Sequence, residues 1–246
     1  MALQIGGGIT IGAGVGILPG FSTATAGLLL HLDAGNTASY PGSGTTWTDL
    51  VSSKVFTLFG SSTPTYSSTK GGYINFVHSS GHYAASSGPN LGSLSTWTVE
   101  AWVSYTGSQG SNPAIVSEVF GSNKINYVIG TPDVGGLVAP TISVGAYPGS
   151  WYAATPGFTP TLNAWYQVVG TYDGSSFNLY INGALQQSSS ATVTTTTSAN
   201  GIVLMKRWDN PDHWGGGLGV VRIYNGALTS TQVTGNWISQ RDRFGI

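Results

Sequence analysis

Carboxylates are the residues that would give this sequence a hydrolytic chemistry. Glycan hydrolysis needs paired carboxylates facing one sugar, about 5 to 9 Å apart, and on a strand such a set takes the form E-x-D-x-E. The glutamates are Glu100 and Glu118, and neither has an acidic neighbour two positions away. Because Glu100 lies between Val99 and Ala101 in a strand pattern, we predict a hydrogen-bonded structural role and no catalytic residue.

Aspartates and histidines offer weaker patterns. Asp209 and Asp212 lie in a segment rich in Asn, Pro and Gly, where the capping of turns is the alternative to catalysis. The histidines are dispersed and suggest no Ser–His–Asp arrangement; they are His31, His78, His82 and His213.

Aromatic residues in loop segments are the remaining candidates for chemistry. Sugars bind by stacking on exposed Trp and Tyr, and loops on a rigid scaffold often carry recognition. Two segments have this character, PGSWY at 148–152 and WDNPDHW at 208–214. The predicted carbohydrate-binding residues are Trp151, Tyr152, Trp208, Asp209, Asp212, His213 and Trp214. The alternative is that these rings close the ends of the fold or lie in a subunit interface.

Short strands must position these loops. Apolar residues alternate at 97–103, 165–172 and 177–181, and again at 218–223. Asp173-Gly174 and Asn182-Gly183 predict tight turns between strands. Short strands with Gly, Pro, Asn and Ser connections indicate an all-β, two-sheet antiparallel sandwich, which we expect over residues 27–228.

Six segments resemble the laminin-G-like domains of the concanavalin A-like lectin/glucanase type, including those in phage virion structural proteins. They are GLLLHLDAGN (27–36), GYINF (72–76), TVEAWV (98–103), WYQVVGTYDG (165–174), LYING (179–183) and GVVRIYNGAL (219–228). The resemblance covers residues 27–245 and implies a jelly roll without a particular ligand.

The same resemblance implies a candidate metal site. Laminin-G-like domains often bind Ca²⁺ through Asp and backbone carbonyls. Asp33 with Asn36 is the best oxygen cluster in this sequence. Stabilisation of a turn is the alternative role for both residues, and no other cofactor is indicated.

The C-terminal segment predicts one short helix. Thr229-Ser230-Thr231-Gln232 has the form of a capping box, and Leu228 with Val233 would form its hydrophobic staple. We expect a helix at residues 230–240, packed on the sandwich. The ending RFGI (243–246) resembles the C-termini of phage structural proteins.

The first 26 residues form a glycine-rich arm. Its large aliphatic residues after Met1 fall on odd positions, as in an extended strand with one apolar face. They are Leu3, Ile5, Ile9, Ile11, Val15 and Ile17, in three repeats with a period of six. Such short repeats cannot bury their own apolar face. We expect the arm to dock on another chain or to support oligomerisation; a loose tail is the alternative.

Composition excludes several classes of function. Charged residues make up 7% of the chain and the formal net charge is −1, so clustered basic residues for nucleic-acid binding are missing. No cysteine is present, which excludes disulfides and thiolate chemistry. No apolar run of membrane-spanning length occurs, and the N-terminus lacks the pattern of a signal peptide.

Two functions remain from the sequence. The first is a non-enzymatic virion structural protein, most simply a capsid decoration or cement protein. Its N-terminal arm would anchor it to capsid or other virion proteins, at the capsid or tail surface. The alternative is a carbohydrate-binding adhesin module on a phage tail fibre or a bacterial surface protein. The arm favours the first function, and the loop tryptophans favour the second.

Overall fold

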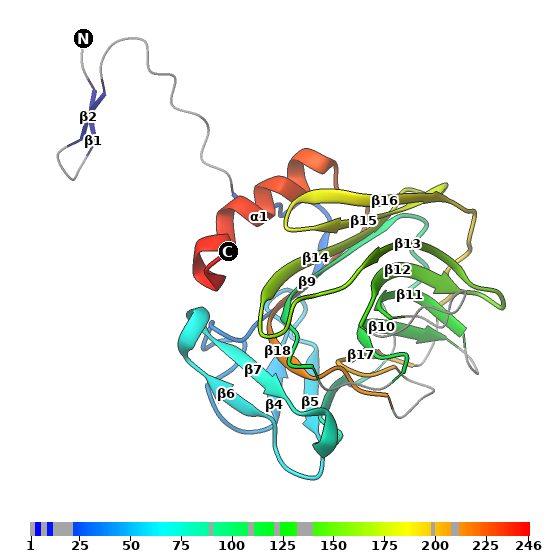
Figure 1. The fold of residues 1–246 in the computed structure, drawn as a ribbon, viewed down its shortest axis with the longest axis horizontal. Coiled ribbons are helices and arrows are strands. Elements are labelled where there is room, and N and C mark those ends of the chain that lie inside the picture. The colour runs from blue at the N-terminus through cyan, green and yellow to red at the C-terminus, as the bar shows by residue number, and fades with distance from the viewer. Residues whose placement is uncertain are drawn as a thin grey trace.

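The computed structural model describes residues 3–5, 9–11, 22–88, 91–107, 111–120, 124–131, 140–197, 200–207 and 212–246. Two antiparallel sheets face each other, with one helix outside them (Figure 1). This confirms the predicted all-β, two-sheet jelly roll. Among the described residues, no helix is long and apolar enough to cross a membrane.

We call one of these layers the front sheet. It contains β4 (Thr46–Thr48), β5 (Val55–Phe59), β8 (Tyr83–Ser86), β10 (Ala114–Phe120), β11 (Lys124–Gly130), β12 (Ile142–Tyr147), β13 (Tyr152–Phe158) and β17 (Ile202–Leu204). Its strand order is β13-β12-β11-β10-β17-β8-β5-β4.

The other layer is the back sheet. It contains β3 (Leu28–Asp33), β6 (Thr65–Ser67), β7 (Tyr73–Phe76), β9 (Trp97–Ser104), β14 (Trp165–Tyr172), β15 (Ser176–Ile181), β16 (Ala184–Ser190) and β18 (Gly216–Tyr224). Its strand order is β16-β15-β14-β9-β18-β7-β6, and β3 also pairs with β18. Short 3₁₀ turns, η1 (Thr69–Gly71) and η2 (His78–Ser80), flank β7.

Turn residues set the hairpin between β15 and β16. Asn182 and Gly183 have φ angles of 51° and 77°, the left-handed values that a two-residue hairpin turn requires. Asn and Gly tolerate these angles better than other residues do. The turn that the sequence predicts is therefore confirmed.

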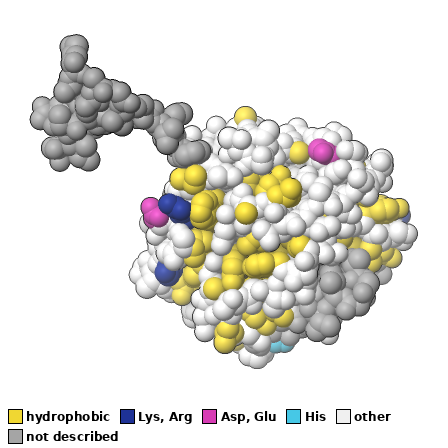
Figure 2. Space-filling view, turned by 45° about the horizontal axis from the view of Figure 1, so that its top comes forward, with side chains coloured by type: hydrophobic (Ala, Val, Ile, Leu, Met, Phe, Trp, Pro, Cys, Tyr) yellow, Lys and Arg dark blue, Asp and Glu magenta, His cyan; other side chains and the backbone are white. Residues whose placement is uncertain are grey.

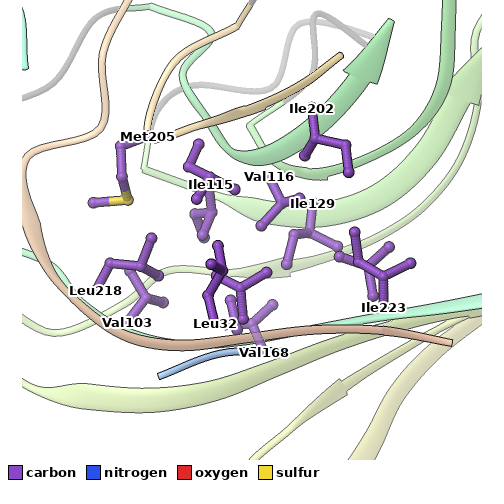
Figure 3. Packing of buried hydrophobic residues seen from close by; sticks show 14 of the residues in the cluster. Leu32, Val103, Ile115, Val116, Ile129, Val168, Ile202, Met205, Leu218 and Ile223 are labelled. Carbon is purple, nitrogen blue, oxygen red and sulfur yellow. The ribbon is translucent and has the colours of Figure 1, made fainter. Parts of the chain in front are cut away.

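The core lies between the two sheets. Ile115, Val116, Ile129, Ile202 and Met205 of the front layer meet Leu32, Val103, Val168, Leu218 and Ile223 of the back layer (Figure 3). All of these side chains are buried. Because alternate residues of each strand face this layer, the remaining ones form the outer faces of the two sheets.

Helix α1 (Ser230–Phe244) covers the outer face of the back sheet. It begins after Thr229, whose side chain accepts a hydrogen bond from the Gln232 amide, so the predicted capping box is confirmed. Leu228 and Val233 pack in one cluster, as a staple requires. The predicted end at residue 240 is wrong, because the helix continues to Phe244.

The arm contributes β1 (Leu3–Ile5) and β2 (Ile9–Ile11), which form a separate antiparallel pair. Leu3 pairs with Ile11, and Ile5 pairs with Ile9. The first two repeats thus pair with each other, where the sequence predicted one extended strand. Val15 and Ile17 of the third repeat lie outside the described residues.

The surface of the jelly roll carries few charges. Figure 2 shows one face on which isolated charged side chains lie among hydrophobic patches and neutral polar atoms. This agrees with the charged fraction of 7%.

Candidate functional site

The outer face of the front sheet has a floor of small side chains. Ser117 pairs with Val128 of β11 and with Val203 of β17. Val128 continues to Gly145, and Val203 continues to Ala85. Their sequence neighbours Val116 and Leu204 belong to the core, so alternation turns this row outward. Small side chains leave room for aromatic rings to lie across the sheet.

Trp151 lies over this floor. Its ring centroid is 5.0 Å from that of Tyr147, and both rings pack against a cluster that contains Ile125 and Val128. The guanidinium carbon of Arg207 lies 5.5 Å from the centre of the Trp151 ring. Trp151 is partly exposed, so the part of the ring that Arg207 leaves uncovered, with the guanidinium donors beside it, is a surface suited to a sugar ring.

Arg207 belongs to the segment that follows β17. Lys206 forms a bridge with His213, and the Arg207 amide donates to the Asp212 carbonyl at 3.4 Å. The Asp212 carboxylate accepts a hydrogen bond of 2.9 Å from the Asn112 amide. Arg207, the residue before the second loop segment, therefore contacts Trp151 of the first.

Sequence reasoning missed Arg207 and Tyr147. Tyr147 is the residue before the segment 148–152, and Arg207 is the residue before the segment 208–214. An Arg next to an aromatic loop is a weak signal, because only the pairing of β10, β11 and β12 brings the segments together.

Trp214 and Tyr152, which the sequence also predicted to bind carbohydrate, do not share the surface of Trp151. Trp214 is wholly buried, and its indole N–H donates to the Ser104 carbonyl at 3.0 Å, so it cannot offer a ring face to a sugar. Tyr152 is 38% exposed but pairs with Ala146, a core residue, which places it on the other side of β13. Trp208 and Asp209 lie outside the described residues.

His213 is buried, with 9% exposure. Its carbonyl accepts a hydrogen bond from Nδ1 of His78 at 3.1 Å, and its ring centroid is 5.9 Å from that of Tyr83. His213 therefore supports the base of the loop and is not a surface ligand by itself.

Glu100 has the predicted structural role. It is wholly buried beneath α1, where Oε1 accepts hydrogen bonds from Trp102 and Gln167, at 3.0 and 2.9 Å, and lies 3.3 Å from Nη1 of Arg222. Asn236 of the helix donates to Oε2 at 2.7 Å. This carboxylate is fully engaged and cannot meet a substrate.

Glu118 is buried at the other end of the sandwich. Its carboxylate accepts hydrogen bonds from the Leu91 amide, Asn126 and the Tyr127 hydroxyl. Burial raises the pKa of Glu118, and these hydrogen bonds only partly oppose the effect. The group is structural and has no access to a ligand.

Asp33 and Asn36 do not fit the implied calcium site. Both carboxylate oxygens of Asp33 accept hydrogen bonds from Arg243, at 2.9 and 2.7 Å. Burial alone would raise the pKa of Asp33, but the hydrogen bonds and charge of Arg243 outweigh it and hold the pKa below its usual value. Asn36 Oδ1 accepts from the Ala38 amide. The cation that meets Asp33 is thus a guanidinium, and Asn36 stabilises a turn.

Within the described ranges, no three His, Cys, Asp or Glu residues form a group that could hold a metal ion.

A pocket of about 600 Å³ lies elsewhere, beside the start of β5. It is lined by Leu29, Ser52, Ser53, Lys54, Val55, Ser87, Gly88 and Leu91. None of the predicted site residues lines it, and its Lys54 ammonium donates to the Ser87 carbonyl at 3.3 Å. The aromatic surface at Trp151 has the more suitable chemistry for a sugar.

Comparison with known proteins identifies the family of this fold. A model of the concanavalin A-like lectin/glucanases superfamily matches residues 78–234. A comparison with curated protein sequences gave no match.

Solved structures share the architecture. Domain 4 of AbnA, an extracellular arabinanase from Geobacillus stearothermophilus in complex with arabinotriose, is 22% identical, with a TM-score of 0.66 over 85% of this chain and 97% of that one. The Trypanosoma rangeli sialidase is 14% identical, with a TM-score of 0.62 over 93% of this chain and 36% of the sialidase. The receptor binding domain of botulinum neurotoxin type G is 14% identical, with a TM-score of 0.58 over 87% and 52% of the two chains. At these identities the likeness establishes the fold.

Proposed function

Since the chain belongs to the concanavalin A-like lectin/glucanase superfamily, we propose that it is a non-catalytic carbohydrate-recognition protein whose ligand binds beside Trp151. The observation that carries this proposal is the contact of Arg207, in the segment after β17, with Trp151, in the loop after β12. Trp151 would stack on the apolar face of a sugar ring. Arg207 and Asp212 would contact its hydroxyls and fix its orientation.

The chemistry of the neighbours supports this choice. The similar arabinanase domain was solved with arabinotriose, and the similar toxin domain is a receptor binding domain. Both are binding modules on the same fold. Fold alone does not assign a ligand, so the proposal depends on the aromatic surface of this chain.

The proposed absence of catalysis depends on the glutamates. Retaining and inverting glycosidases both need an accessible acid and a second carboxylate beside the same sugar. Glu100 and Glu118 are both wholly buried and hydrogen-bonded, so neither can protonate a glycosidic oxygen.

Binding to an array of glycans, followed by calorimetry with the glycans that bind, tests the proposal. Trp151→Ala should weaken binding by about 2 kcal/mol, roughly 30-fold in Kd, as for other tryptophan hot spots. Trp237→Ala is a matched control, because the Arg241 guanidinium carbon lies 4.7 Å from the Trp237 ring centre in a similar pair on α1. Equal effects of the two substitutions, or no binding by the wild type, would reject the proposed site.

Turnover assays on the same glycans test the non-catalytic part. We expect no product with the wild type. Release of reducing ends that disappears in a folded Glu100→Gln variant would show that the protein is an enzyme.

A second function, attachment to a larger assembly, is favoured by the arm. The paired strands β1 and β2 are three residues long each, and a two-stranded ribbon of this size is marginal by itself. A partner chain that adds a strand or an apolar surface would complete it. The resemblance of the RFGI ending to the C-termini of phage structural proteins makes a virion surface the assembly we propose, with capsid or other virion proteins, or copies of this chain, as partners.

A further inference from the structure

A second aromatic group lies on the same outer face. Phe59 of β5 pairs with Tyr83 of β8, and their rings stack with centroids 4.8 Å apart at 17°. The Lys206 ammonium lies 4.5 Å from the centre of the Tyr83 ring. Because β8 lies between β17 and β5 in the sheet, Phe59 and Lys206 flank Tyr83 on opposite sides. We call these three residues the lysine ladder.

Phe59 is the exposed apolar ring of the lysine ladder, with 40% of its surface accessible. Val77, the residue before η2, is a second exposed apolar side chain, at 39%. Thr46 pairs with Thr57, and two residues further along the same antiparallel register Gly44 lies opposite Phe59. A side chain carbon added at Gly44 would meet no atom within 4 Å, so the space beside Phe59 on this side is empty. The side of Phe59 that faces away from Tyr83 is therefore open to a ligand ring.

Lys206 supplies the positive charge of the ladder. The ion pairs Arg222–Glu100, Arg241–Asp242 and Arg243–Asp33 do not involve it. The imidazoles of His78 and His213 lie beside the ladder, with ring centroids 6.2 Å apart. The side chains that meet Tyr83 are thus the Phe59 ring, the His213 imidazole and the Lys206 ammonium, while the Asp212 carboxylate accepts a hydrogen bond from the Asn112 amide.

Lys206 and Arg207 connect the ladder to the site at Trp151. These adjacent residues reach in different directions, to Tyr83 and to Trp151. From β5 to β12 the front sheet takes five strand-to-strand steps, about 24 Å at normal spacing. A ligand that contacts both groups must be an oligosaccharide and not a single sugar.

We propose that the lysine ladder is a subsite for a carboxylate-bearing sugar residue of this oligosaccharide. This inference rests on the proposed function. The exposed ring of Phe59 would take the apolar face of the sugar, and the Lys206 ammonium would take its carboxylate. A single ammonium matches a monoanion, whereas phosphate groups usually meet several donors.

The test compares acidic oligosaccharides with neutral copies of themselves. The probes are oligomers of galacturonate, glucuronate and mannuronate and a sialylated trisaccharide, each also with its carboxylates reduced to alcohols. At least one acidic probe should bind the wild type about tenfold more tightly than its reduced form, the gain expected for one charge-assisted hydrogen bond. Lys206→Gln should abolish this ratio, and Phe59→Ala should weaken both forms.

Lys70→Gln is the matched control, since this exposed lysine lies in η1 beside the back sheet. It should leave the ratio unchanged. A ratio near one in the wild type, or a ratio that survives in Lys206→Gln, overturns the inference. If both forms bind equally and Trp151→Ala weakens both, the proposed function stands without the acidic subsite. If no probe binds, both proposals fail.

Discussion

At the scale of single residues, Glu100 connects several elements of the fold. Sequence position alone predicted a structural glutamate, and the structure shows a buried carboxylate that joins β9, β14, β18 and α1 through Gln167, Arg222 and Asn236. A buried ion pair adds little over a well-packed apolar pair, but removing one partner leaves an uncompensated charge. Glu100 therefore specifies where the helix sits.

Glu100→Gln should lower the free energy of unfolding by about 3 kcal/mol, because Arg222 would stay buried without a counter-charge. Urea unfolding followed by tryptophan fluorescence measures this loss. Adding Arg222→Met to Glu100→Gln should recover part of it. A single variant as stable as the wild type would contradict the assigned role, and glycan binding should not change in either variant.

His31 should make stability depend on pH. Burial, assisted by the neighbouring charge of Arg222, lowers the pKa of His31 to about 4 from 6.5. The folded protein thus keeps this ring neutral while the unfolded chain takes up a proton. The contribution of the neutral His31 ring to the free energy of unfolding is fully present above pH 6.5 and should be lost as the pH drops towards 4.

Thermal unfolding across this pH range measures the effect. His31→Gln should flatten the pH dependence of the Tm, leaving a remainder from His82, whose pKa burial also lowers. An unchanged pH profile in His31→Gln would show that this ring does not titrate on unfolding.

At the scale of elements, α1 shows what local signals can and cannot predict. Its start follows from contacts within four residues, Thr229 with Gln232, and was predicted correctly. Its end depends on residues distant in sequence. Arg243 binds Asp33, and Phe244 stacks 4.6 Å from Trp102 and 4.8 Å from Trp165. A charged stretch such as 241–243 resembles a solvated end until these partners are known.

Phe244→Ala should therefore lower the free energy of unfolding by about 3 to 5 kcal/mol, the usual cost of emptying a buried aromatic site. Ile246→Ala is the control, because Ile246 is only partly buried in the same cluster. The measurement is again chemical denaturation. A loss below that of the control would mean that the last turn of α1 contributes little to stability.

At the scale of the whole molecule, the jelly roll could be predicted from alternation and turn residues, because both are local patterns. The site could be predicted only in part. Trp151 and Asp212 were named, but the contact of Trp151 with Arg207 follows from strand register across β17, β10, β11 and β12, which no local pattern encodes. Trp214 was placed in a binding loop although it packs in the core, since a tryptophan in a polar segment gives no signal of burial.

The arm should be separable from the jelly roll. Deleting residues 1–20 should leave the Tm unchanged, because every described core cluster consists of residues after this segment, the earliest being Ala24. Co-sedimentation with particles that lack this protein should fail for the deletion variant. It should also fail for the double variant Ile9→Asp with Ile11→Asp, because burying the two carboxylates in an apolar interface would cost several kcal/mol of binding free energy. Thr10→Asp should matter less. Full occupancy by the deletion variant would place attachment on the jelly roll.

The most direct test of glycan recognition at Trp151 uses the indole N–H resonances of the eight tryptophans, assigned by substitution and followed during titration with a bound glycan. The Trp151 resonance should shift in proportion to occupancy, while those of the buried Trp47, Trp97, Trp102 and Trp214 and of Trp237 on α1 stay in place. A saturating titration that shifts Trp237 and leaves Trp151 unmoved would contradict glycan recognition at Trp151.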